Sequence, residues 1–281
     1  MPKQRSRVAV RTKVTDEIIA TLLHDIASGV LKPGDRMDNE RDLAAQFGVS
    51  QPTIREAIRV LDTLGLIDVR HGSGAYATGD ASQLVELALR TLLQIERVGI
   101  LDVLEIHVIL GEYSARCAVH QARESDIAHM NALAAALADS EGLHSVQEIA
   151  EMVVDFQATF AASTRNPLLF ALEAFMIKLL MQFQLTATAD RGLEFWRERS
   201  AELAADRRAI VAALRERDED AMVAAISGYL ASQGEIFASD PELANLRLSD
   251  AKSLHTVKTV PLQMRAYRNT DFLAVTPTVD V

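Results

Sequence analysis

The sequence of 281 residues contains only one cysteine, Cys117. One cysteine cannot form a disulfide within the chain, and it cannot supply the thiolates of a cysteine-based metal site. Long apolar runs are also missing, since the stretch ILDVLEIHVIL is interrupted by Asp102, Glu105 and His107. A helix that crosses a bilayer needs about 18 or more apolar residues in a row. The sequence therefore predicts no membrane span.

Several motifs that enzymes use are absent as well. The sequence has no glycine-rich phosphate loop, no nucleophile elbow and no cluster of His, Asp and Glu at metal-ligand spacing. The basic N-terminal stretch MPKQRSRVAVRTKV has no apolar core of a signal peptide. These absences predict a cytoplasmic protein that is not an enzyme and that uses no metal or other cofactor.

Charge is distributed unevenly along the chain, whose formal net charge is −10. Residues 1–79 contain 11 basic and 10 acidic residues, whereas the remainder contains 18 basic and 29 acidic residues. The first 15 residues hold five Lys or Arg and no acid. Because the local potential governs contact with DNA phosphates, this pattern favours a basic tip on an acidic body.

The stretch VSQPTIREAIRVLDTLG, residues 49–65, predicts a helix with two different faces. Ser50 can cap its start, Pro52 suits its first turn and Gly65 suits its end. One face is apolar and carries Ile54, Ile58, Leu61 and Leu64. The other face carries side chains that suit phosphates and base edges, namely Gln51, Thr53, Arg55 and Arg59.

The elements around this helix predict a winged helix-turn-helix over residues 14–79. A helix is expected from Thr15 or Asp16 to Ser28, and a short one in NERDLAAQFG, with Asn39 as its cap and Gly48 as its end. A very short turn joins this second helix to the helix after Ser50. The segments LIDVR and AYAT, on either side of HGSG, are expected to form a hairpin. Residues 1–13 are expected to be a basic arm.

Residues 80–237 show helical apolar stripes and no strand pattern, which predicts an all-α bundle of six or seven helices. Residues 238–281 contain three prolines and little periodicity, and are expected to form a tail or a docked arm. The predicted fold class is mainly α, with an N-terminal winged helix-turn-helix followed by the helical bundle.

The stretch LKPGDRMDNERDLAAQFGVSQPTIREAIRVLDTLGLIDVRHGSGAYAT resembles the DNA-binding domain of GntR-type bacterial transcription regulators. The helical region, through STRNPLL and RRAIVAALRERDEDAM, is similar to the FCD effector domain of the FadR subfamily. The resemblance covers about residues 14–236. It implies a homodimeric regulator that binds a palindromic operator in double-stranded DNA and responds to a small-molecule effector.

The resemblance implies DNA contacts around the recognition helix and in the wing, from Arg41, Ser50, Gln51, Thr53, Arg55, His71 and Gly72. Arg59 joins them because it shares the polar face of that helix. Position 51 departs from the family pattern, in which Arg is common. Arg41 and Arg59 have an alternative role, since they could pair with Asp38 and Glu56.

Many FCD domains bind a divalent metal through one Asp and three His. The corresponding positions here are Val153, Gln157, Arg207 and Tyr229, so the resemblance implies no metal. Helical spacing indicates that Arg207, Tyr229 and Gln157 point into the apolar bundle, where buried arginine is rare unless it is paired. Our hypothesis is that Arg207 binds the carboxylate of an effector, with Tyr229, Gln157, Val153 and His107 around it. The alternative is an internal salt bridge from Arg207 to Asp155, Glu112 or Asp206.

The favoured function is a ligand-responsive transcription regulator, a repressor released by a small organic acid or another anionic metabolite. A fatty acyl thioester is the alternative effector. A dimeric DNA-binding protein that responds to no effector is the second alternative.

Overall fold

The computed structural model describes residues 3–78, 82–239, 244, 245 and 247. The chain divides into two compact units, residues 1–88 and residues 89–281. Most of the expected C-terminal tail or arm, residues 238–281, lies outside the described residues, as do the first two residues of the expected N-terminal arm.

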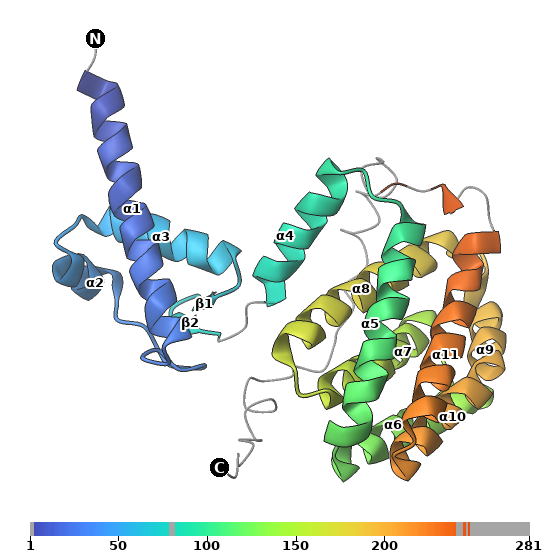
Figure 1. Ribbon diagram of the computed structural model, residues 1–281. Coiled ribbons are helices and arrows are strands. Elements are labelled where there is room, and N and C mark those ends of the chain that lie inside the picture. Colours follow the sequence, from blue (N-terminus) through green and yellow to red (C-terminus); the bar gives the residue numbers. More distant parts are fainter. Residues whose placement is uncertain (1–2, 79–81, 240–243, 246, 248–281) are drawn as a thin grey trace. The chain divides into compact units, whose positions relative to one another are not determined.

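The first unit contains three helices and a two-stranded antiparallel sheet (Figure 1). These elements are α1 (Lys3–Ala27), α2 (Glu40–Phe47), α3 (Gln51–Thr63), β1 (Ile67–Arg70) and β2 (Gly74–Ala77). The start expected for the first helix is wrong, since α1 begins at Lys3 and continues through much of the expected arm. No proline or glycine lies between residues 3 and 28 to end the helix earlier.

The ends of α2 and α3 follow from local chemistry. The Asn39 side chain accepts hydrogen bonds from the backbone N–H groups of Arg41 and Asp42, which have no partner within α2. Gly48 ends α2 in the left-handed conformation, with φ 64°. Ser50 occupies the N-cap position of α3, but its hydroxyl lies 2.9 Å from the Thr53 hydroxyl and caps no backbone N–H.

The core of the first unit lies between α1 and α3. The apolar face of α3 is almost completely buried and packs with Ile18 and Leu22 of α1. In the sheet, Ile67 lies opposite Ala77 and Arg70 opposite Gly74, so residues 71–73 form the tip of a wing. The predicted winged helix-turn-helix is confirmed, and its core fixes which face of α3 points outward.

Among the described residues of the second unit, every regular element is a helix, and α4 crosses the boundary between the units. Its elements are α4 (Ser82–Ile95), α5 (Ile100–Gln121), α6 (Glu124–Ala138), the 3₁₀ turn η1 (Ser140–Gly142), α7 (Val146–Ser163), α8 (Pro167–Ala187), α9 (Gly192–Glu202), α10 (Ala204–Glu216) and α11 (Glu219–Ser239).

The described residues after the wing thus form eight α-helices, and the expected number of six or seven is wrong. The missed boundary lies at Leu203, which ends α9 and begins α10. The sequence contains no proline, glycine or capping side chain at this point, and Leu203 itself is buried. Packing of α9 and α10 against other helices therefore decides the break.

The bundle is built around α5, α7 and α8, which contact one another, and α11 lies along α5 (Figure 1). The most apolar helix is α8, which is long and apolar enough to cross a membrane by length and composition. The expectation that ILDVLEIHVIL is the longest candidate for a membrane span was therefore wrong. However, 61% of the most apolar window of α8 is buried inside the protein, which is also typical of the core helix of a globular bundle.

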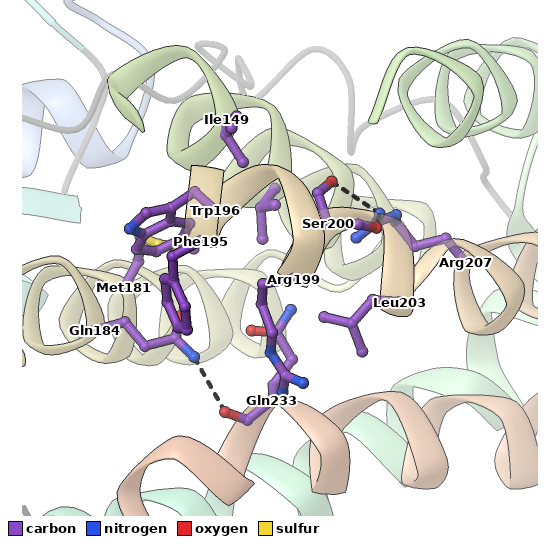
Figure 2. Close-up of a pocket in the computed structure, with 11 residues that line it drawn as sticks. Ile149, Met181, Gln184, Phe195, Trp196, Arg199, Ser200, Leu203, Arg207 and Gln233 are labelled. Carbon is purple, nitrogen blue, oxygen red and sulfur yellow. Dashed lines mark hydrogen bonds between the residues drawn. The ribbon is translucent and has the colours of Figure 1, made fainter. Parts of the chain in front are cut away.

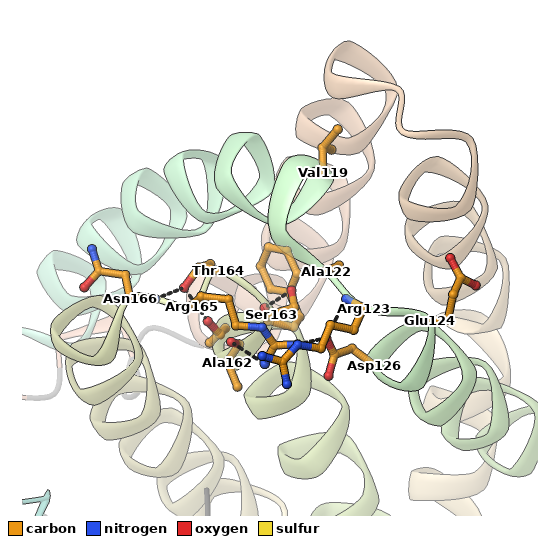
Figure 3. Close-up of polar contacts among 12 residues, drawn as sticks. Val119, Ala122, Arg123, Glu124, Asp126, Ala162, Ser163, Thr164, Arg165 and Asn166 are labelled. Carbon is orange, nitrogen blue, oxygen red and sulfur yellow. Dashed lines mark hydrogen bonds and ion pairs between the residues drawn. The ribbon is translucent and has the colours of Figure 1, made fainter. Parts of the chain in front are cut away.

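One corner of the bundle is held by an ion pair (Figure 3). Arg165, between α7 and α8, donates to the Asp126 carboxylate at the start of α6, and both side chains are largely buried. Asp126 also accepts from the backbone N–H of Arg123, at 2.8 Å, and so caps its own helix. The pair ties the α7–α8 connection to α6.

Candidate nucleic-acid interface and ligand cavity

The recognition helix α3 presents a polar face near its N-terminus. Gln51, Arg55 and Arg59 are exposed, as expected from the sequence, and so is Ser50. Thr53 is only 6% exposed, so the expectation that it lies on the outward face is wrong. Its hydroxyl contacts Ser50, and it supports the turn before α3 instead of facing outward.

Arg55 pairs with Glu40, the first residue of α2. The guanidinium Nε lies 3.0 Å from Oε1 of Glu40, and Nη2 lies 2.6 Å from Oε2. The hydrogen bond from Arg55 holds the pKa of the Glu40 carboxyl below its ordinary value. The Arg55 side chain is still 55% exposed, so its guanidinium remains accessible from solvent.

The alternative role of Arg41 and Arg59, in which they pair with Asp38 and Glu56, has no support among the described residues. Arg41 and Arg59 are exposed and form no ion pair with a described residue. Asp38 instead accepts from the side chain of Gln46 at 2.8 Å. Both arginines therefore present an unneutralised charge.

The wing carries further basic groups. His71 and Gly72 are exposed at its tip, and Gly72 has a φ of 73°, which suits glycine. Arg70 lies over the ring of Tyr76, at 4.5 Å from its centroid, and pairs with Asp68 at 2.8 Å. Sequence reasoning missed Arg70, although a basic residue directly before HGSG was a signal for it.

Three cavities lie inside the second unit. The first, the arginine cavity, has a volume of about 350 Å³, and its polar lining consists of Gln184, Arg199, Ser200, Arg207 and Gln233 (Figure 2). The second, the glutamate cavity, has about 270 Å³ and the polar lining His107, Gln157, Glu173 and Tyr229. The third, the glutamine cavity, has about 310 Å³ and the polar lining His107, Gln157, Gln184 and Gln233.

The three cavities adjoin one another through shared walls. Gln184 and Gln233 line both the arginine and the glutamine cavities, and the Gln184 side chain donates to the Gln233 carbonyl at 3.0 Å. His107 and Gln157 line both the glutamine and the glutamate cavities. The five residues expected around an effector are thus gathered in this one system, with Val153 and Arg207 at one end.

Arg207 is completely buried and has no acidic partner among the described residues. Its Nη2 donates to the Ser200 carbonyl and lies 3.1 Å from the Ser200 hydroxyl, whereas Nε and Nη1 have no hydrogen-bond partner in the described structure. The proposed internal salt bridge is wrong, because Asp155 pairs with His129 at 2.8 Å and Glu112 accepts from Ser227 at 2.8 Å. The third candidate, Asp206, forms no ion pair with it either.

Tyr229 connects the arginine to the rest of the polar lining. Its hydroxyl accepts from Gln233 at 2.7 Å, and its ring packs edge-to-face on Phe156. Burial raises the pKa of Tyr229, while the nearby Arg207 charge acts in the opposite direction. Tyr229 therefore remains a neutral hydrogen-bonding group beside the buried cation.

Two sequence families cover most of this architecture. Residues 14–77 match the family described as "Bacterial regulatory proteins, gntR family", and residues 102–232 match the FCD domain. The chain thus consists of a GntR-type helix-turn-helix domain followed by an FCD domain. Its domains and named relatives are those of DNA-binding transcription regulators, not of enzymes, as the sequence motifs indicated.

The chain is similar to several GntR-type regulators. An uncharacterized HTH-type regulator of Mycobacterium tuberculosis is 35% identical over 130 residues, which are 45% of this chain and 52% of that protein. The match thus spans about half the length of that relative. The repressor NanR of Citrobacter rodentium is 26% identical over 232 residues, which are 81% of this chain and 86% of NanR.

A solved structure supports the same fold. The GntR protein of Streptococcus agalactiae superimposes with a TM-score of 0.58 at 20% identity, covering 78% of this chain and 97% of that one. This similarity confirms the predicted fold class, a winged helix-turn-helix followed by an all-α bundle.

The four positions at which the resemblance to FCD domains would place metal ligands do not provide a ligand set here. Val153, Gln157, Arg207 and Tyr229 stand there, and Arg207 brings a positive charge of its own. Among the described residues, no group of three or more His, Cys, Asp and Glu lies close enough together to hold a metal ion.

Sequence reasoning missed Glu173 and Ser200 in the FCD cavities. Glu173 lies on α8, four residues after Leu169 and four before Ile177, both of which are buried. An acid at helical spacing between apolar residues was a signal for a buried carboxyl. Ser200 gave no such signal, because its position depends on the break between α9 and α10.

Proposed function

We propose that this protein is a cytoplasmic transcription regulator that acts as a homodimer and responds to a small organic acid. The observation that carries the DNA-binding part is the exposed, basic N-terminal half of α3 beside an exposed wing. In a helix-turn-helix this end of the recognition helix enters the major groove. The repressor function of NanR favours repression that the effector relieves.

The proposed DNA contacts divide into two kinds. Arg55 and Gln51 are proposed to contact base edges, because a bidentate Arg–guanine pair gives about 1–3 kcal/mol of discrimination. Phosphate contacts position a protein on DNA without discriminating between bases. We assign such contacts to the remaining residues of the proposed interface, namely Arg41, Ser50, Arg59, His71 and Gly72. Thr53 is left out, because its hydroxyl is buried against Ser50.

Binding to a fragment of the protein's own promoter, followed by fluorescence anisotropy over a range of salt concentrations, tests the DNA-binding proposal. We expect tight binding at low salt that weakens steeply as salt rises, because counterions are released from the DNA. A competitor duplex of shuffled sequence should bind more weakly. Equal affinity for both duplexes, or no binding at low salt, would contradict the proposal.

The effector is proposed to place a carboxylate against the free side of the Arg207 guanidinium. The arginine cavity is lined by two arginines and, among its described lining residues, no acid, so it favours an anion. Arg207 suits this role because its planar fork pairs with both oxygens of a carboxylate. Tyr229, Gln157 and His107 would orient the rest of the ligand, and Val153 supplies an apolar wall.

The polar lining favours a small acid over a fatty acyl thioester. Each of the three cavities presents four or five polar side chains. A long acyl chain would bury these side chains without giving them hydrogen-bond partners.

The variant Arg207→Met tests the anchor. Methionine fills similar space without a charge, and removing an unpaired buried charge leaves the fold at least as stable. Thermal melting of both proteins with propionate, butyrate, succinate and glutarate is the measurement. We expect a ligand-induced shift in the melting temperature of the wild type only.

Two outcomes would contradict parts of this proposal. A shift that persists in Arg207→Met removes the anchor role from Arg207. No shift with any organic acid, together with intact operator binding, favours a dimeric DNA-binding protein that responds to no effector.

The homodimer is supported by an apolar stripe on α5. Ile106, Ile109 and Tyr113 are each about half exposed, and their spacing puts them on one side of the helix. Exposed apolar groups that share a face favour association with another surface. A two-fold dimer would present two recognition helices to the two halves of a palindromic operator. The effector can then change operator affinity only as far as it binds one arrangement of the dimer more tightly than another.

A further inference from the structure

The Glu173 carboxyl is a buried acid without a cationic partner among the described residues. It lies on α8, is 1% exposed and lines the glutamate cavity. The Ser114 hydroxyl of α5 donates to one carboxyl oxygen, and no described basic side chain forms an ion pair with it. Burial raises the pKa of Glu173 to about 7, so its charge is costly unless a cation lies beside it.

His107, on α5, lines the same cavity and does not neutralise Glu173. Its ring is 4% exposed, and its Nδ1 has no hydrogen-bond partner in the described structure. Burial lowers the pKa of His107 to about 4, so the imidazole is neutral at physiological pH. The glutamate cavity therefore offers hydrogen-bond acceptors and one carboxyl group that can ionise, but no positive charge from its described lining residues.

The arginine cavity, at the other end of the set, contains a buried positive charge. Arg207 is buried there, with two nitrogen atoms that lack hydrogen-bond partners in the described structure. Gln184, Gln233, Gln157 and His107 form the polar lining between the two ends. Glu173 is the only acid among the described lining residues of all three cavities. A buried guanidinium and a buried carboxyl, neither with an oppositely charged partner among the described residues, thus line the two outer cavities of this set.

We propose that the effector carries an ammonium group as well as a carboxylate, joined by a short aliphatic spacer, and that its ammonium binds Glu173. This inference rests on the proposed function, because it takes Arg207 as the site of the carboxylate. An amino acid of this kind neutralises both buried groups when it binds. Charge-assisted hydrogen bonds are about twice as strong as neutral ones, and burial strengthens them further.

The same charges discriminate against related acids. A monocarboxylate leaves Glu173 without a cationic partner, and a dicarboxylate brings a second negative charge toward it, which is unfavourable in a buried site. A spacer of a few methylene groups suits the apolar walls formed by Ile177 and Leu230, which line both the glutamate and the glutamine cavities.

The experiment compares ω-amino acids with their counterparts that lack the amino group. The probes are β-alanine, γ-aminobutyrate, δ-aminovalerate and ε-aminocaproate, against propionate, butyrate, valerate and caproate. Calorimetric titration of the full-length protein is carried out above the pH range in which Glu173 titrates. We expect at least one amino acid to bind about tenfold or more tightly than its counterpart, since a hydrogen bond to a charged group contributes about 1.5–3 kcal/mol.

Two variants assign the preference to Glu173. Glu173→Gln keeps the shape and the Ser114 contact but removes the charge, and it is expected to bind both members of a pair with similar affinity. Glu198→Gln, on the exposed side of α9, removes an equal charge away from the cavities and should keep the preference. Operator binding by each variant confirms that it is folded.

The outcomes separate this inference from the proposed function. If monocarboxylates bind through Arg207 and no amino acid binds more tightly, the ammonium site is wrong and the organic-acid effector stands. A preference that survives in Glu173→Gln also overturns the ammonium site. If no carboxylate of either series binds, the organic-acid effector itself is wrong, and the ammonium site falls with it.

Discussion

The Arg55–Glu40 pair shows how a residue proposed for base recognition is held before DNA arrives. Hydrogen bonding to Glu40 raises the pKa of Arg55 further, so the guanidinium is always charged. The side chains of Arg55 and Glu40 are 55% and 35% exposed, so solvent screens the pair and it contributes little to folding. Glu40 therefore fixes the rotamer of Arg55, and DNA binding has to exchange this carboxylate for a base edge or a phosphate.

The variant Arg55→Gln is expected to lose operator discrimination. One bidentate contact gives about 1–3 kcal/mol, so the affinity ratio between the operator and a shuffled duplex should fall about tenfold or more in each half-site. Competition anisotropy at constant salt measures this ratio. The control Arg215→Gln makes the same charge change at an exposed position of the second unit and should keep the ratio. An unchanged ratio in Arg55→Gln would assign Arg55 to a phosphate contact.

Glu173 and His107 make stability depend on pH in opposite directions. Burial raises the pKa of Glu173 from 4.5 to about 7, so the folded protein binds this proton more tightly, and raising the pH through that interval lowers the free energy of unfolding. Burial lowers the pKa of His107 from 6.5 to about 4, so lowering the pH through that interval lowers the free energy of unfolding. The two effects partly cancel in the wild type.

The variant Glu173→Gln separates these effects, because glutamine does not titrate. The free energy of unfolding of the variant minus that of the wild type should increase from pH 4.5 to about 7. The increase is on the order of 3 kcal/mol, from about 1.4 kcal/mol per pKa unit. Urea denaturation at a series of pH values is the measurement. The same difference for Glu198→Gln should stay constant, and a constant difference for Glu173→Gln would mean that Glu173 titrates normally.

At the scale of the elements, side chains near helix ends position the helices of the FCD domain. The two nearly buried partners Arg165 and Asp126 join the α7–α8 connection to α6 (Figure 3). Also near the start of α6, Arg217 ends α10 with φ 57° and donates to the carbonyls of Val119 and Ala122, at 2.8 Å each. These contacts satisfy carbonyl groups at the end of α5 that have no partner within the helix.

The variant Asp126→Asn is expected to destabilise the protein by about 3 kcal/mol, because it leaves the largely buried Arg165 charge without its anion. Chemical denaturation followed by circular dichroism is the measurement. The control is Glu219→Gln, which breaks the exposed pair with Arg116 and should cost less than about 1 kcal/mol. Equal losses in the two variants would show that burial does not strengthen the Arg165–Asp126 pair.

For the whole molecule, the small positive charge of the N-terminal part and the apolar stripe on α5 both favour DNA binding by two copies. The N-terminal 79 residues have a net charge of +1, from 11 basic and 10 acidic residues, although the chain as a whole has a net charge of −10. The local surplus is too small to bind DNA tightly through charge alone. Two copies held in the proposed dimer would double the number of phosphate contacts and of base contacts.

The variant Ile109→Glu is expected to convert the dimer to a monomer, because it puts a charge into the apolar stripe of α5. Sedimentation equilibrium measures the change, and operator affinity should fall at least tenfold because each monomer binds only one half-site. Val30→Glu alters an exposed apolar residue of the first unit and should leave the dimer intact. A dimer that persists in Ile109→Glu would place the interface elsewhere.

The sequence by itself determined the local features of the protein. Asn39, Gly48 and Pro52 set helix ends through contacts within a few residues, and the apolar period of α3 fixed its buried face. The same local logic located the hairpin and placed Arg207 and Tyr229 inside the bundle. These features were predictable because capping, turns and helical periodicity depend on neighbours along the chain.

Only the tertiary structure decided the features that join distant residues. It showed that Arg55 pairs with Glu40 rather than standing free, that Thr53 is buried, and that a break at Leu203 brings Ser200 to Arg207. It also placed Glu173 in a cavity that adjoins the cavity of Arg207. These outcomes depend on which helix faces pack together, and that choice is made by the burial of apolar surface over the whole domain.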